Sequence, residues 1–157
     1  MDRFRIVFVV PARNEERSIL KVINYLNNYG DTIIIDDCSD DNTFNILLNQ
    51  NVIKLQNKSK QGYQKSVIIG LQEAKKLKYD FAITFDADGQ HLNLDMSKFI
   101  KELNNSCDLI ITQRNIKNRI SEYILSFYSK IFYDGVDLLS GVKAYKVSNL
   151  KNELLNL

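Results

Sequence analysis

The stretch DFAITFDADGQH (residues 80–91) joins an apolar run to a cluster of acidic and amide side chains. Its first part, FAITF (81–85), has the length and the β-branched and aromatic content of a buried strand. Side chains two residues apart on a strand point to the same side, so Asp86 and Asp88 should converge while Ala87 turns away. Because clustered negative charges repel one another, this strand end predicts a cation site.

Asp86, Asp88 and Gln90 would supply oxygen ligands to that cation. Hard oxygen ligands suit Mg²⁺ or Mn²⁺, which typically keep positions for water and for the phosphate oxygens of a substrate. The alternative is structural: Asp88 would cap a turn, or the helix that starts near Asp95. His91 is the only histidine of the chain. We expect it to be a polar neighbour or capping group, since one histidine cannot build a nitrogen-rich metal site.

Short apolar runs alternate with helical patterns along the whole chain. The apolar runs predict strands at residues 4–10, 32–36, 51–55, 81–85, 108–112 and 141–147. Two helices are predicted from apolar side chains that share one helical face, namely Ile19, Val22, Ile23 and Leu26, and Met96, Phe99, Ile100 and Leu103. A third helix is predicted over residues 63–78. Strands joined by crossover helices form a mostly parallel sheet with helices on both faces, so the predicted fold class is α/β.

The composition fits one compact globular domain over residues 1–157, with 45% hydrophobic and 25% charged residues. The formal charge of +2 is too small to indicate a nucleic-acid partner. Cys38 and Cys107 stand far apart without metal-ligand spacing, which argues against a zinc site or a disulfide framework. The longest apolar run has about seven residues, whereas a membrane span needs roughly 18 or more. We therefore expect a cytoplasmic protein.

Polar residues follow four of the predicted strands. In an open α/β sheet the ligand crevice lies at the carboxyl ends of the strands, so these residues are the candidates for a site. They are PARNEE (11–16), DDCSDDNT (36–43), DADGQH (86–91) and QRN (113–115). Pro11 is expected to end the first strand.

Five segments in this order resemble the family 2 glycosyltransferases of the glycosyltransferase A-type fold, a Rossmann-like α/β fold. They are VVPARNEERSI (9–19), TIIIDDCSDDNT (32–43), GYQKSVIIGLQEA (62–74), DFAITFDADGQH (80–91) and SGVKAYKV (140–147). The resemblance runs from about residue 4 to residue 147. Two of its motifs, DADGQH and SGVKAY, are similar to the branch that includes dolichyl-phosphate mannosyltransferases and bacterial polyprenyl-phosphate glycosyltransferases.

The resemblance implies roles for individual residues. Pro11, Ala12, Arg13, Glu15 and Asp37 would line the pocket for the base and ribose of a nucleotide sugar. Asp88 would hold a metal ion against the diphosphate, with Asp86 and Gln90 supporting it. Arg114 and Arg119 would stabilise the charge that develops on the departing diphosphate. Asp137 would approach the acceptor.

The resemblance also leaves structural readings open. Asp36 or Asp37 could be a turn residue, and Ser39 or Asp40 could cap the next helix. The family usually has glycine and threonine where this chain has Cys38 and Asp40, which we interpret as tolerated loop changes. The aromatic segment 118–135 would be either a helix that covers the sheet or an interfacial helix near a lipid acceptor.

The function implied is inverting transfer of a sugar from a UDP- or GDP-linked donor to a lipid phosphate or saccharide acceptor, with Mg²⁺ or Mn²⁺ as cofactor. A lipid acceptor would bring the protein into peripheral contact with the inner face of the membrane. The candidate catalytic residues are Asp86, Asp88, Arg114 and Asp137. Two alternatives remain: a noncatalytic nucleotide-binding module, and a nucleotidyltransferase, for which PARNEE lacks the glycines and the basic end. The chain stops at Leu157, earlier than expected from the resemblance, so we expect a C-terminally short domain.

Overall fold

The computed structural model describes residues 4–103, 109–111 and 141–150. The described chain alternates strands and helices along most of its length, in the order expected from the sequence. The elements are β1 (Ile6–Ala12), α1 (Ile19–Leu26), β2 (Asp31–Asp36), α2 (Thr43–Leu48), β3 (Ile53–Gln56), α3 (Tyr63–Lys76), β4 (Phe81–Thr84), α4 (Met96–Lys101), β5 (Leu109–Ile111), β6 (Lys143–Lys146) and the short 3₁₀ helix η1 (Val147–Asn149).

The strands form one mixed sheet in the order β3-β2-β1-β4-β6-β5. β1 lies in the middle and pairs in parallel with β2 and with β4, and β2 pairs in parallel with β3. β6 runs antiparallel to both β4 and β5. The predicted α/β class and the mostly parallel sheet are confirmed, and each predicted strand matches an observed one within a few residues.

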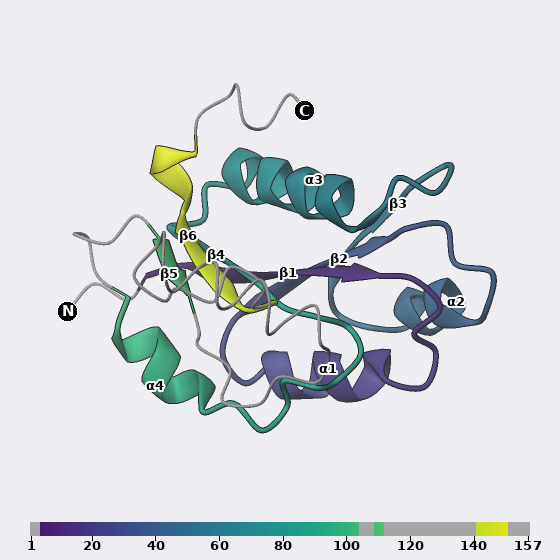
Figure 1. Ribbon diagram of the computed structural model, residues 1–157, viewed down its shortest axis with the longest axis horizontal. Coiled ribbons are helices and arrows are strands. Elements are labelled where there is room, and N and C mark those ends of the chain that lie inside the picture. Colours follow the sequence, from purple (N-terminus) through teal and green to yellow (C-terminus); the bar gives the residue numbers. More distant parts are fainter. Residues whose placement is uncertain (1–3, 104–108, 112–140, 151–157) are drawn as a thin grey trace, which may run out of the picture.

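Helices cover both faces of this sheet (Figure 1). The residues of β1 alternate between two cores: Phe8 and Val10 pack with buried side chains of α1, α2 and α4, whereas Val7 and Val9 pack against α3. The face of α1 predicted from helical spacing is fully buried. A parallel sheet that is buried on both sides explains why the strands are solidly apolar.

Pro11 does not end the first strand, because β1 continues to Ala12 beside β2. The Val9 carbonyl accepts a bond from Phe85 N–H on the β4 side, and the Ala12 carbonyl accepts one from Asp37 N–H on the β2 side. Backbone groups alternate in direction along a strand, so the backbone nitrogen of Pro11, like that of Val9, is directed toward β4. The pairing of β1 with β4 ends at Val9, before Pro11 is reached. The missing donor of the proline therefore falls where no partner strand needs it.

In the part of the chain that the structure describes, no helix has both the length and the apolar content to cross a membrane.

Gly70 allows α3 to lie close to the sheet. A Cβ at this position would lie 2.7 Å from Ile35 Cδ1 and closer still to Val9 Cγ1. We predict that Gly70→Ala lowers the free energy of unfolding by about 1–3 kcal/mol, because overpacking outweighs the better helix propensity of alanine. Urea denaturation measures this change. Gln64→Ala, at an exposed position of the same helix, is the control and should leave stability unchanged or slightly raised; equal midpoints for both variants would contradict the packing argument.

Candidate active site

A pocket of about 300 Å³ opens where the carboxyl ends of β1, β2 and β4 meet the start of α3. It brings together the residues from three separate sequence motifs. Of the residues predicted from sequence, the pocket is lined by Pro11, Ala12, Arg13, Glu15, Asp37, Asp86 and Asp88. The register of the sheet explains the convergence, because Ala12 pairs with Asp36, and Val9 pairs with Thr84, two residues before Asp86.

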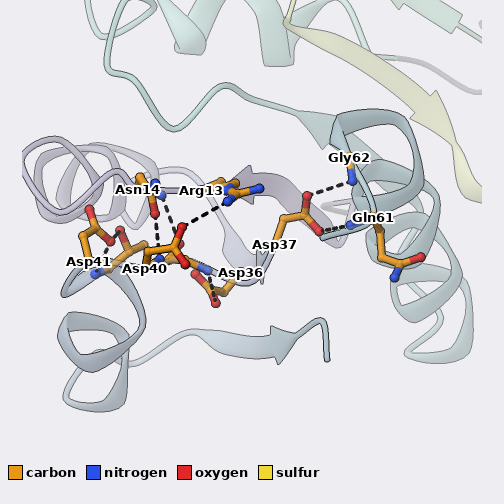
Figure 2. A network of polar contacts seen from close by, with 10 residues as sticks. Arg13, Asn14, Asp36, Asp37, Asp40, Asp41, Gln61 and Gly62 are labelled. Carbon is orange, nitrogen blue, oxygen red and sulfur yellow. Dashed lines mark hydrogen bonds and ion pairs between the residues drawn. The ribbon is translucent and has the colours of Figure 1, made fainter. Parts of the chain in front are cut away.

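Asp37 anchors the loop that leads into α3 (Figure 2). Its carboxylate accepts bonds from Gln61 N–H at 2.7 Å, from Gly62 N–H at 2.8 Å and from the Asn57 amide at 2.7 Å. Burial alone would raise the pKa of Asp37, but these hydrogen bonds and the charge of Arg13 outweigh it and hold the pKa below its usual value. Asp37 is thus an ionised, oriented carboxylate on the pocket wall.

Asp36, the preceding residue, does not line the pocket and is fully buried. One carboxylate oxygen accepts bonds from Ser39 N–H and from the Gln56 amide, each at 3.3 Å. Asp36 therefore has the turn role that the sequence left open. Its other oxygen is buried without a hydrogen-bond partner among the described residues.

Neither Ser39 nor Asp40 caps the next helix, so that expectation is wrong. α2 starts after Asn42, and the Asp41 carboxylate accepts bonds from the backbone N–H and hydroxyl of Thr43. Ser39 instead accepts a bond from Asn14 N–H at 3.0 Å, and Asp40 turns toward Arg13. These side chains tie the loop after β2 to the loop after β1.

Arg13 and Glu15 complete the β1 side of the pocket. The Arg13 guanidinium pairs with Asp40 at 3.0 Å, a contact visible in Figure 2. The Glu15 carboxylate accepts a bond from the Ser18 hydroxyl at 2.6 Å, and the Glu15 N–H donates to the Thr43 hydroxyl at 2.7 Å. The loop after β2 thus holds the Arg13 side chain, and Ser18 at the start of α1 holds the Glu15 side chain.

Asp86 lies just after β4 and is contacted from several sides. The Tyr63 hydroxyl donates to Asp86 Oδ1 at 3.0 Å, and His91 Nε2 lies 3.2 Å from Asp86 Oδ2. Gly141 packs so closely that a Cβ there would overlap the carboxylate. His91 is a polar neighbour of Asp86, one of the two roles expected for it.

Asp88 is exposed and lines the same pocket wall as Asp86, while Ala87 between them turns into the core. Asp88 Oδ1 accepts a bond from Gln90 N–H at 2.9 Å, so Asp88 does cap a turn, as the structural alternative proposed. It does not cap the next helix, because Asp95 caps α4 with its own carboxylate. The Gln90 side chain is exposed and is not among those lining the pocket.

The pair of carboxylates fits a cation that is shared with a ligand. Among the described residues, no three His, Cys, Asp or Glu side chains cluster tightly enough to hold a metal by themselves. Mg²⁺ is usually bound through one or two carboxylates together with substrate phosphates, and less often by an all-protein cage. Asp86 and Asp88 on one pocket wall match that donor set.

Several predicted residues lie outside the described part of the chain: Arg114, Arg119, Asp137, Cys107 and the aromatic segment 118–135. Their proposed roles stay predictions.

Sequence reasoning missed the pocket residues contributed by the loop before α3 and by the first turn of that helix. They are Lys60, Gly62, Tyr63 and Ser66. The available signal was Gly62 at the start of a predicted helix: its φ of +90° strongly favours glycine and marks a sharp turn at the same sheet edge.

The family model of glycosyl transferase family 2 matches residues 7–134, most of the chain. The chain belongs to glycosyl transferase family 2. Its curated relatives include the UDP-N-acetylglucosamine–dolichyl-phosphate N-acetylglucosaminyltransferase of Methanococcus voltae, 33% identical over 93% of this chain and 71% of the relative. The undecaprenyl-phosphate mannosyltransferase of Micrococcus luteus is 22% identical over 94% of this chain and 68% of the relative.

Solved structures agree on the fold of this family 2 chain. The glucosyl-3-phosphoglycerate synthase of Mycobacterium tuberculosis, in complex with Mn²⁺, UDP and glucosyl-3-phosphoglycerate, superimposes with a TM-score of 0.69 at 16% identity. The match covers 92% of this chain and 57% of the synthase, so the chain spans little more than half of that enzyme. The likeness confirms the expected glycosyltransferase A-type fold.

Cys38 adopts a left-handed backbone conformation with φ of +58°. This conformation costs a non-glycine residue roughly 1–2 kcal/mol. Glycine would relieve this strain but would lose more backbone entropy on folding, which offsets part of the gain. We therefore predict that Cys38→Gly raises the free energy of unfolding by about 0.5–1 kcal/mol. Urea denaturation measures it. Cys38→Ala removes the sulfur but keeps the strain, and a gain as large in that variant would contradict the backbone explanation.

The hydrogen bonds to Asp37 predict a pH-dependent contribution to stability. Because its folded-state pKa is lowered, this contribution is complete above the unfolded value of about 3.9 and is lost as pH falls through the folded pKa. In Asp37→Asn, the side-chain NH₂ group would face Gly62 N–H, so two donors would meet and one hydrogen bond would be lost. We predict that this variant lowers the free energy of unfolding by about 2 kcal/mol at pH 7, and by less below about pH 4. Thermal unfolding across pH 3–7 measures it. Asp40→Asn is the control, because the Asp40 side chain is 74% exposed, and it should lower the free energy of unfolding by less than about 1 kcal/mol. Equal losses of stability in the two variants would argue against the role of Asp37.

Proposed function

We propose that this chain is the donor-binding part of an inverting, divalent-metal-dependent glycosyltransferase. The sugar would move from a nucleoside diphosphate, UDP- or GDP-linked, to a polyprenyl phosphate or a saccharide. Membership of glycosyl transferase family 2 supports sugar transfer as the reaction class. The printed activity of the archaeal relative, which names a UDP-sugar and a dolichyl phosphate, supports this choice of donor and acceptor.

One observation carries the proposal: the carboxylates of Asp37, Asp86 and Asp88 lie on the walls of one pocket. Asp37 stands at the end of β2, and the paired aspartates follow β4. A nucleoside diphosphate has a base and ribose at one end and phosphates at the other. We assign the β1 and β2 side, with Pro11, Ala12, Arg13, Glu15 and Asp37, to the nucleoside.

The phosphate end would lie against Asp86 and Asp88. These two residues would hold Mg²⁺ or Mn²⁺, which supplies charge neutralisation for the departing diphosphate. Without a cation, two carboxylates would repel the phosphates. The mycobacterial synthase of the same fold was solved with both UDP and Mn²⁺, which supports the choice of a divalent ion. Lys60 lines the pocket as a cation of the chain itself.

The chemistry at the acceptor depends on which acceptor is used. A lipid phosphate is already ionised and needs no general base, whereas a hydroxyl acceptor requires one. Asp137 is the candidate for that base, and Arg114 and Arg119 are the candidates for stabilising the diphosphate. A lipid acceptor would place the chain at the cytoplasmic face of a membrane. A product assay with lipid-phosphate and saccharide acceptors distinguishes the two.

A noncatalytic nucleotide-binding module is the second candidate, because the residues that line the described pocket are those assigned above to the nucleotide and its cation. Such a module would bind the nucleotide with the cation and transfer no sugar. Product formation from a panel of nucleotide sugars excludes it.

We predict that Asp88→Ala abolishes the Mn²⁺-dependent part of stabilisation by a nucleoside diphosphate, because one of the two proposed metal ligands is lost. Thermal shifts with UDP, GDP, CDP and dTDP, each with and without Mn²⁺, measure it. Asp95→Ala is the control: it removes an exposed aspartate that caps α4, so it should lower the baseline melting temperature and keep the Mn²⁺ response. An unchanged Mn²⁺ response in Asp88→Ala would rule out the metal role of Asp88.

A further inference from the structure

Tyr63 faces Asp86 across the pocket from the start of α3. Its hydroxyl donates to Asp86 Oδ1 at 3.0 Å, while the side chain stays 51% exposed. Tyr63 is absent from both clusters of core residues, so its place is at the pocket and not in the core. A tyrosine hydroxyl is protonated at neutral pH, so it can donate this bond to the carboxylate.

Two other described residues lie against the Asp86 carboxylate. His91 lies 3.2 Å from Oδ2, and the edge of the His91 ring packs on Phe85, which is fully buried. The backbone of Gly141 closes a further side. Tyr63 approaches from across the pocket and donates to Oδ1, whereas His91 lies against Oδ2.

The position of Tyr63 depends on Asp37. The two residues before Tyr63, Gln61 and Gly62, donate their backbone N–H groups to the Asp37 carboxylate. The Asn57 amide donates both to Asp37 and to Ser66 on the first turn of α3. One short segment, residues 57–63, therefore connects the carboxylate on the nucleoside side to the carboxylate on the phosphate side.

We propose that Tyr63 is a positioning residue that orients the Asp86 carboxylate for a divalent cation. Residues 57–63 hold Tyr63 in place through Asp37. This inference rests on the proposed function, since it requires that Asp86 and Asp88 bind a cation together with a nucleotide. Hydrogen bonds to a ligating carboxylate fix its orientation, and their loss typically costs tenfold or more in metal affinity.

The test compares Tyr63→Phe with Tyr79→Phe in Mn²⁺ titrations. Tyr79 is a matched control, because its hydroxyl also donates to an aspartate, Asp31 Oδ2 at 2.6 Å, at the opposite end of the sheet from the pocket. Each variant is titrated with Mn²⁺ in the presence of whichever of UDP, GDP, CDP and dTDP stabilises the unsubstituted chain most. Protein-bound Mn²⁺ is followed by electron paramagnetic resonance, and nucleotide affinity without metal is measured by calorimetry.

We expect Tyr63→Phe to need about tenfold more Mn²⁺ for half-saturation, with unchanged metal-free nucleotide affinity. Tyr79→Phe should match the unsubstituted chain in both measurements. Equal or tighter Mn²⁺ binding by Tyr63→Phe overturns the positioning role while the proposed function stands. If the unsubstituted chain itself binds no Mn²⁺ with any of the four nucleotides, the proposed metal-dependent function fails, and the role of Tyr63 fails with it.

Discussion

The parallel pairing of β1 with both β2 and β4 is the constraint on which the rest of the site depends. Parallel strands end at the same edge of a sheet, so the residues that follow β1, β2 and β4 must meet there. The chain separates Pro11 from Asp37 by one helix and one strand, and separates Asp37 from Asp86 by two helices and two strands. Only the register of these three strands places them around one pocket.

Bringing carboxylates to one edge creates repulsion, and the sequence suggested that a cation must relieve it. The structure shows that hydrogen-bond donors already meet most of these groups: backbone N–H groups at Asp37, a hydroxyl and an imidazole at Asp86, and a turn N–H at Asp88. The fold therefore does not need a metal to satisfy these carboxylates. A cation would matter for the phosphates of a ligand, which these donors do not neutralise.

The sequence predicted the six strands and the helices α1, α3 and α4, because these elements carry their own periodic signals. The buried stripe of α1 and the β-branched runs of β1 and β2 depend on local spacing, which a single chain displays. Contacts between side chains distant in sequence carry no such signal. The link between Asp37 and residues 61–62, the contact of Tyr63 with Asp86 and the continuation of β1 past Pro11 all depend on the assembled sheet.

Cys38 and Asp40, the two residues that depart from the resemblance, are likewise explained by contacts in the assembled fold. Cys38 keeps the left-handed turn that a glycine would adopt more easily, because its neighbours on both sides are held by the fold: Asp37 N–H bonds to Ala12, and Ser39 N–H bonds to Asp36. Asp40 pairs with Arg13 across the two loops. The loop after β2 thus keeps its path through contacts with the sheet and with the loop after β1, and this path lets Asp37 face the pocket.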